Sequence, residues 1–180
     1  SYIDYPPLKI LWDGQIPPGA FSPGYRLNPK EDAFLDAEIE AWLDYGHVEY
    51  QRRPCVFAAG LFATKPTDMH RMRAVVNYQP GSNKVIVPLQ FPQPTIQSLI
   101  NGVTGCYFYS LMDLRSGYHQ LRVEEASQHL LVFRHGNHLW RPKRLFEGIS
   151  IGCSLFQSAM MDIHQDQMRR GRLSIYLDDC

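Results

Sequence analysis

The sequence has no long apolar run, no paired-cysteine motif and no net charge, and each of these absences limits what the protein can be. No run approaches the roughly 20 apolar residues that a membrane-spanning helix needs, which excludes a transmembrane protein. The 18 basic and 18 acidic residues cancel, so no overall field attracts the chain to nucleic acid. We also find no internal repeat and no low-complexity tract.

The cysteines give no sign of a disulfide framework or of a zinc finger. Four are present, tens of residues apart, with no Cys-x-x-Cys pair and no histidine at zinc-finger spacing: Cys55, Cys106, Cys153 and Cys180. This usage is typical of reduced thiols. We therefore expect an intracellular, reducing compartment, and the pattern does not specify an organelle.

The composition is that of a folded protein with an uneven distribution of charge. A length of 180 residues is enough for one ordinary domain or two small lobes, and hydrophobic residues make up 44% of the positions. Residues 28–50 carry seven acids against one lysine, whereas residues 51–146 carry twelve basic residues against four acids. A local basic face is therefore expected despite the neutral total. Its candidates are Arg52, Arg53, Lys65, Arg71, Arg73, Lys84, Arg115, Arg122, Arg134, Arg141, Lys143 and Arg144.

The first 27 residues are expected to form an extended arm. Six prolines and three glycines fall within the first 30 positions, which prevents regular pairing of the backbone. The arm is nevertheless rich in apolar side chains such as Ile10 and Trp12, so we expect it to be ordered only by contact with a partner. The chain begins without Met and without a signal-peptide core, which suggests a trimmed, processed or incompletely read N-terminus.

Residues 28–180 are expected to form one α+β domain. Asn28-Pro29-Lys30-Glu31 predicts a capped helix that ends near Gly46. Further elements are expected from apolar periodicity and turn residues: a hairpin of residues 56–63 and 73–78, a helix at 95–100, a strand at 106–112, a second hairpin over 121–140 with its turn at Gly136-Asn137, a helix at 151–168 and a strand at 173–177. His135 and His138 flank that turn without a third ligand, so we interpret them as hairpin residues rather than a metal site.

Three carboxylates follow apolar strand-like segments. Asp113 follows residues 107–112, and Asp178-Asp179 follow residues 175–177. If those strands are neighbours, the carboxylates meet at one edge and are suited to bind Mg²⁺. Two such ions would activate a primer 3′-hydroxyl and stabilise the leaving pyrophosphate. The plainer interpretation is that Asp178-Asp179 form a polar turn and Asp113 caps the next helical turn.

A family resemblance favours the metal site. Tyr176-Leu177-Asp178-Asp179 resembles the Tyr-x-Asp-Asp box of reverse transcriptases, and residues 111–120 (LMDLRSGYHQ) resemble the first-aspartate segment of gypsy-type LTR-retrotransposon enzymes. Residues 73–78, 91–94 and 155–160 are similar to the family's fingers strand, Phe-Pro-x-Pro link and palm helix. The order and spacing agree from about residue 23 to 179. The resemblance implies a right-hand polymerase fingers-palm fragment, in which helices back an antiparallel palm sheet and the thumb is absent.

The resemblance also implies roles for individual residues. Asp113, Asp178 and Asp179 would hold two Mg²⁺ ions and act in catalysis. The nucleotide site would comprise Lys65, Arg73, Ser116, Gly117, Tyr118 and Glu147. Arg73 and Lys65 would lie over the triphosphate, the amides of Ser116 and Gly117 would contact phosphate oxygens, and Tyr118 would exclude a 2′-hydroxyl. Alternatively, Arg73 belongs to a solvated strand face and Tyr118 is a core aromatic.

Several departures from the family pattern weigh against polymerisation. Asn77 stands where the family usually has Asp, and the segment 146–153 (FEGISIGC) replaces a Pro-Phe-Gly-Leu-x-Asn-Ala-Pro loop. Glu147 would then repel the polyanionic nucleotide. After Asp179 only Cys180 follows, so the second strand of the Tyr-x-Asp-Asp hairpin, the thumb and the ribonuclease H regions are expected to be missing.

Two hypotheses about function remain. The favoured one is a truncated or domesticated copy that is a structural subunit of a larger protein or ribonucleoprotein assembly. Its partners would be other protein subunits, with RNA or an RNA-DNA hybrid as a further candidate ligand. The alternative is an active RNA-directed DNA polymerase using Mg²⁺, whose other domains lie on another chain or outside this sequence. A template-binding module without catalysis is intermediate between them. We expect the 180-residue chain alone not to extend a primer.

Overall fold

The first helix forms where the capping signal predicts it. A computed structural model of the protein describes residues 3–64, 72–105 and 107–177, and in it α1 spans Pro29–Asp44. The Asn28 side chain accepts hydrogen bonds from the backbone N–H groups of Lys30 and Glu31, while Glu31 accepts one from the N–H of Asn28. Leu35, Ile39 and Trp42 are buried, which directs the acidic residues of the helix outward.

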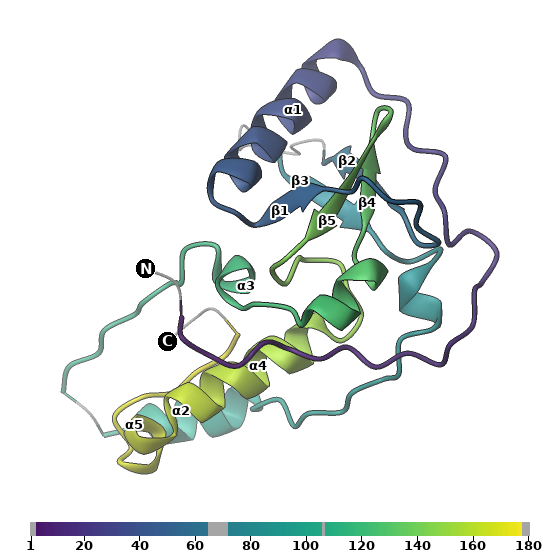
Figure 1. Ribbon diagram of the computed structural model, residues 1–180. Coiled ribbons are helices and arrows are strands. Elements are labelled where there is room, and N and C mark those ends of the chain that lie inside the picture. The colour runs from purple at the N-terminus through teal and green to yellow at the C-terminus, as the bar shows by residue number, and fades with distance from the viewer. Residues whose placement is uncertain (1–2, 65–71, 106, 178–180) are drawn as a thin grey trace.

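A five-stranded sheet lies beside α1 (Figure 1). Its strands are β1 (Val48–Tyr50), β2 (Ala59–Ala63), β3 (Ala74–Asn77), β4 (Phe133–His135) and β5 (His138–Pro142), in the order β1-β5-β4-β2-β3. Both predicted hairpins are confirmed: β2 pairs antiparallel with β3, and β4 pairs antiparallel with β5 around Gly136. Strand β1 was not predicted, because three residues are too few to show the alternation of apolar and polar side chains that is typical of a strand.

The sheet is mixed, whereas the sequence predicted an antiparallel one. Strands β2 and β4 pair in parallel, with Ala59 opposite Phe133 and Gly60 opposite Arg134. A parallel pair needs a long crossover connection, and about 70 residues separate β2 from β4. Hairpin chemistry fixes only the pairs that are close in sequence, so the central contact of the sheet was not predictable from local pattern.

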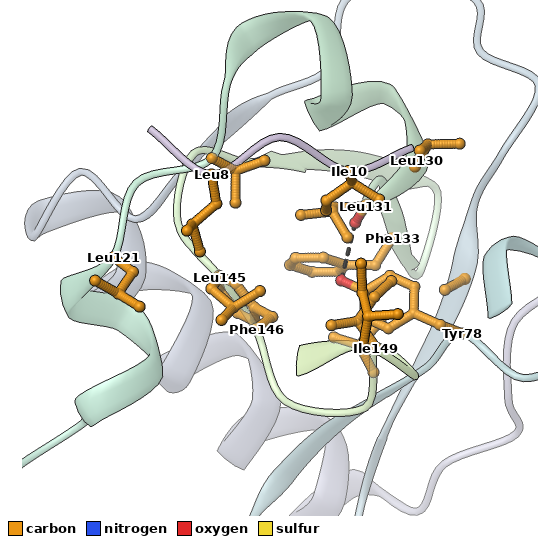
Figure 2. Packing of buried hydrophobic residues seen from close by; sticks show 14 of the residues in the cluster. Leu8, Ile10, Tyr78, Leu121, Leu130, Leu131, Phe133, Leu145, Phe146 and Ile149 are labelled. Carbon is orange, nitrogen blue, oxygen red and sulfur yellow. Dashed lines mark hydrogen bonds between the residues drawn. The ribbon is translucent and has the colours of Figure 1, made fainter. Parts of the chain in front are cut away.

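The N-terminal arm packs against the rest of this same chain, so the expectation that only a partner orders it is wrong for residues 3–27. Leu8 and Ile10 lie in the hydrophobic core next to Leu121, Leu130 and Leu145 (Figure 2). Single β-bridges join Leu8 to Val123, Trp12 to Ile86 and Phe21 to Ala58. The prolines prevent continuous strand pairing, but they leave enough backbone groups free for isolated bridges.

Two predicted palm strands are absent from the described residues. Residues 107–112 have no regular secondary structure and are exposed, with Tyr107 at 95% and Leu111 at 83%. Residues 173–177 contain only a single bridge position, at Tyr176. Apolar strand-like sequence needs a neighbouring strand to pair with, and the described part of the chain supplies none at this place.

The remaining helices agree with the sequence pattern more closely. Helix α2 (Ile96–Val103) is capped by Thr95, and the predicted helix at 151–168 forms α4 (Gly152–Ile163) and α5 (Gln165–Arg169), with a break at His164. Short helical turns span Ser82–Lys84 (η1), Gly117–Gln120 (α3) and Glu125–Leu130 (η2). None of the helices in the described ranges is long and apolar enough to cross a membrane.

Shortening an apolar side chain of the arm should destabilise the whole domain. Ile10 is 3% exposed, and Ile10→Ala is expected to lower the free energy of unfolding by about 2–4 kcal/mol, because it leaves a cavity in the core. Urea unfolding followed by circular dichroism measures this change. Ile16→Ala is the matched control, since Ile16 is 62% exposed in the same arm and should change stability by less than about 0.5–1 kcal/mol. Equal effects of the two variants would contradict the placement of the arm.

Candidate nucleotide and metal site

The segment that carries Asp113 ends in a strained turn. Asp113 is exposed and stands at a single bridge position. Ser116 adopts a left-handed conformation with φ of 51°, which is unfavourable for a residue with a Cβ by about 1–3 kcal/mol. The side-chain amide of Gln120 donates to the carbonyl of Arg115 at 3.1 Å and closes this turn. The strain is therefore offset by local hydrogen bonding and by the start of α3 at Gly117, which is buried.

Three of the predicted nucleotide-site residues lie around one cavity. Arg73, which immediately precedes β3, Ser116 from the turn before α3, and Glu147 from the loop before α4 line a space of about 300 Å³. Successive members of this set are 43 and 31 positions apart in the sequence, and only the fold brings them together. The other lining residues were not predicted: Phe34, Glu38, Trp42, Met72, Ala74, Val76, His119 and Phe146.

The loop that bears Glu147 is fixed on both sides. Gly148 has φ of 97°, and a Cβ at this position would lie 2.5 Å from the carbonyl oxygen of Val76, so only glycine fits. The Asn83 side chain donates to the carbonyl of Gly148 at 2.9 Å and accepts from the N–H of Ser150 at 2.8 Å. Glu147 is thus held beside β3 and the Arg73 side of the cavity.

His119 forms part of the cavity wall and belongs to an aromatic cluster. Its ring lies 4.4 Å from Phe146, 5.9 Å from Trp42 and 4.9 Å from His47, between ring centroids. Burial, and then the neighbouring His47, lower the pKa of His119 from 6.5 to about 4. Burial and the Arg144 charge also lower the pKa of His47. At neutral pH the wall therefore presents a neutral imidazole.

Tyr118 lies outside the residues that line this cavity. Its ring stacks on Phe156 of α4, with centroids 4.9 Å apart and an interplanar angle of 14°. Its hydroxyl donates to Sγ of Cys153 at 3.1 Å. The ring is half-buried, and it packs against the hydrophobic core as the core-aromatic interpretation describes. Its role as a gate stays a prediction.

A buried glutamine fixes the turn that leads to Asp178-Asp179. Gln157 of α4 is fully buried; its amide donates to the carbonyl of Ile175 at 3.2 Å and its carbonyl accepts from the N–H of Leu177 at 2.7 Å. Leu177 has φ of 54°, which is strained for a leucine. Gln157 therefore holds a conformation that the backbone would not adopt alone. The sequence showed α4, but not that one of its polar residues points into the core.

Several predicted residues lie outside what the structure describes, namely Lys65, Asp178 and Asp179. Within the described ranges no three His, Cys, Asp or Glu side chains are grouped as metal ligands.

Asn77, which departs from the family pattern, donates to the Tyr25 hydroxyl at 2.7 Å and so connects the arm to β3. His135 and His138 face each other across the β4–β5 hairpin as predicted, and His135 also lies 2.9 Å from Asp36 of α1.

Replacing Gln157 by leucine should loosen the turn before Asp178. One buried and one partly buried hydrogen bond are lost, and two backbone groups lose their Gln157 partner, so we expect Gln157→Leu to lower the free energy of unfolding by about 1–3 kcal/mol. Hydrogen exchange read by mass spectrometry should become faster in the peptide that contains Leu177. Gln167→Leu on the exposed face of α5 is the control and should leave this exchange unchanged. Unchanged exchange in Gln157→Leu would contradict the clamp.

Stability should fall on acidification because His119 is held neutral. The folded pKa lies below the ordinary value of 6.5, so its contribution is complete above pH 6.5 and is lost between pH 6.5 and about 4. Relative to His119→Gln, the wild-type chain should lose about 2 kcal/mol of stability between pH 7 and pH 5. Urea titrations at the two pH values measure this difference. A His119→Gln profile parallel to wild type would contradict the assignment.

Comparison with known proteins identifies the family. No protein-family model matches the chain. The transposon Tf2-7 polyprotein of Schizosaccharomyces pombe is 31% identical over 165 residues, which are 86% of this chain and 11% of the polyprotein. The retrovirus-related Pol polyprotein from transposon 412 of Drosophila melanogaster is 30% identical over 113 residues, which are 63% of this chain and 9% of that protein. The chain thus spans about a tenth of these curated relatives.

Solved structures show the same fold. The foamy viral protease-reverse transcriptase in complex with double-stranded DNA superposes with a TM-score of 0.83 at 20% identity, covering 99% of this chain and 30% of that one. The same viral protein in complex with an RNA/DNA hybrid gives a TM-score of 0.83 at 20% identity, covering 99% of this chain and 23% of that one. These values establish a reverse-transcriptase-like fold. The chain is therefore a reverse-transcriptase-like region of the gypsy-type LTR-retrotransposon family, as the motifs around Asp113 and Asp178 predicted.

Proposed function

We propose that the chain is the fingers-palm part of an RNA-directed DNA polymerase and acts within a longer polypeptide. Its relatives are polyproteins of which it spans 9–11%. The similar viral protein has been solved with double-stranded DNA and with an RNA/DNA hybrid. We propose the same classes of ligand for the present chain.

The observation that carries this proposal is the cavity between β3, α3 and the loop before α4. It collects Arg73, Ser116 and Glu147, which the family resemblance had assigned to the nucleotide from the sequence. An arginine on one wall provides a fixed positive charge for a triphosphate. Ser116, three residues after Asp113, lines the same cavity. We therefore propose a nucleoside triphosphate as the ligand of this cavity.

Mg²⁺ would be held by Asp113 together with Asp178 and Asp179. The exposed Asp113 carboxylate is a hard oxygen ligand of the kind that Mg²⁺ prefers. When bound, the metal would supply activation of the primer hydroxyl and stabilisation of the leaving group. Gln157 would contribute by holding the turn that delivers the two C-terminal aspartates.

The exposed segment 107–112 supports the view that the working protein is longer. Tyr107 and Phe108 are 95% and 94% exposed, although their sequence is typical of a buried strand. We propose that this segment pairs with further polypeptide when the palm is complete. The division into an arm (1–27) and a fingers-palm domain (28–180) belongs to the same proposal, with the addition that Leu8 and Ile10 of the arm are part of the core.

A structural subunit is the second candidate, and the charge of the cavity favours it. Glu38 and Glu147 line the same space as Arg73, so two carboxylates face one guanidinium. A polyanionic ligand would be repelled by them unless Mg²⁺ or a lysine compensates. If the cavity does not bind nucleotide, the retained fold would instead serve an assembly of proteins or of protein and RNA.

Nucleotide binding separates the two candidates and does not require the rest of the polymerase. Binding of mant-dGTP to the 180-residue chain with Mn²⁺ is measured by fluorescence titration. Under the polymerase proposal, Arg73→Gln should weaken binding about tenfold and Glu147→Gln should strengthen it about tenfold, each equivalent to about 1.4 kcal/mol.

The control for charge is Arg172→Gln, which removes an exposed arginine outside the cavity and should leave the affinity within about twofold of wild type. Asp113→Asn should abolish the dependence on Mn²⁺. Nucleotide binding that is absent from wild type and from Glu147→Gln alike would reject the polymerase proposal and favour the structural subunit.

A further inference from the structure

A basic trough lies along the edge of the sheet formed by β1. Two neighbouring cavities, of about 450 and 330 Å³, share Glu125 in their walls. Strand β1 is one edge of the five-stranded sheet, and neither cavity shares a lining residue with the Arg73 cavity. The trough is therefore a separate surface.

The trough gathers half of the basic residues that the sequence placed between positions 51 and 146. Six basic side chains line it against three carboxylates, an excess of three positive charges in a chain whose net charge is zero. The basic residues are Arg52, Arg53, Arg122, Arg141, Lys143 and Arg144. The sorting of charge along the sequence thus becomes a local positive surface in the fold.

One of the three carboxylates of the trough, Glu49, is already neutralised. Glu49 lies opposite Arg141 in the β1–β5 ladder and is bonded to it, and its second oxygen lies 2.6 Å from Nζ of Lys143. The hydrogen bonds from Lys143 and Arg141 lower the pKa of Glu49. Glu49 therefore serves to organise two cations rather than to repel an anion.

Arg52 and Arg53 are the residues best placed to bind a ligand. They follow β1 after one intervening residue, Gln51, and both are exposed. The backbone on which they stand is fixed, because the N–H of Gln51 donates to the carbonyl of Leu139 at 2.8 Å and the Gln51 side chain donates to the carbonyl of Arg53 at 2.9 Å. In the described ranges neither arginine has an ion-pair partner.

We propose that this trough binds the phosphodiester backbone of a nucleic-acid strand, as a second contact outside the nucleotide cavity. Adjacent guanidinium groups on a fixed backbone suit the bidentate geometry of phosphate oxygens. A row of basic groups along a groove follows successive phosphates, and release of counterions supplies the affinity. The proposal rests on the proposed function only in that the protein must meet nucleic acid. An acidic peptide is the competing ligand.

The test uses fluorescence anisotropy on the full 180-residue chain. The probes are a fluorescein-labelled single-stranded RNA of about 16 nucleotides and an RNA/DNA hybrid of the same sequence. Arg52→Gln/Arg53→Gln is compared with Arg169→Gln/Arg170→Gln, which removes the same charge from the exposed end of α5. Thermal unfolding by circular dichroism checks that both variants fold.

The trough variant should bind the nucleic acid that occupies the trough more weakly than wild type. In a plot of log K against log salt concentration, the magnitude of its slope should be smaller than that of wild type by about 1.4 for RNA and about 1.8 for the hybrid, because two phosphate contacts are lost. Loss with the RNA alone assigns single strands, and loss with the hybrid assigns a duplex. The α5 variant should bind like wild type.

Equal losses of affinity in both double variants would overturn the proposal, because net charge alone would then explain the binding. Unchanged affinity in the trough variant would also overturn it. A third contrary result is displacement of the probe by poly-glutamate at a lower concentration of charged groups than by unlabelled RNA, because the trough would then prefer acidic protein. Binding of mant-dGTP should be unchanged in the trough variant. If the trough variant binds both mant-dGTP and RNA like wild type, the proposed trough is rejected and the proposed nucleotide site is not.

Discussion

One aromatic side chain, Phe146, packs against the sheet, the first helix and the wall of the candidate cavity at the same time. Its ring makes an edge contact with Trp42 of α1 at 4.9 Å, lies 4.4 Å from His119 of α3, and lies 6.0 Å from Phe133 of β4. It is also buried and immediately precedes Glu147. A displacement of this ring would move three elements and the cavity wall together, because close-packed interiors transmit changes in shape.

The backbone near the predicted metal ligands is strained at two described residues, and the core supports it. Ser116 and Leu177 are the non-glycine residues with positive φ in the described ranges, and each precedes or follows a predicted metal ligand by a few positions. Leu177 is stabilised by Gln157 from α4, which packs through Phe156 and Met160 into the same core as the arm. Stability and the geometry of the site are thus linked: residues far from the cavity, such as Ile10, contribute to the rigidity that strained turns require.

The sequence predicted most helices and both hairpins, but it predicted two strands that are absent from the described residues and gave little information on long-range contacts. The capping box at Asn28, the β4–β5 turn at Gly136 and the cap at Thr95 all follow from side chains within four residues of the backbone that they bind. The parallel β2–β4 pair and the packing of Leu8 and Ile10 join segments about 70–115 residues apart, and no local pattern encodes such partners. The same holds for the site. The family resemblance assigned Arg73, Ser116 and Glu147 to one nucleotide site, and these residues line one cavity in the structure. It did not predict Glu38 or His119 as lining residues of that cavity.

The central claim of this account is that Asp113 and the pair after Leu177 form one metal site. Crystals grown from the 180-residue chain with Mn²⁺ and a nucleoside triphosphate, with data collected at the manganese edge, would test it most directly. The account predicts an anomalous peak within about 2.0–2.4 Å of carboxylate oxygens of both Asp113 and Asp178. Carboxylates more than about 10 Å apart, with no metal between them, could not share a two-metal site and would contradict it.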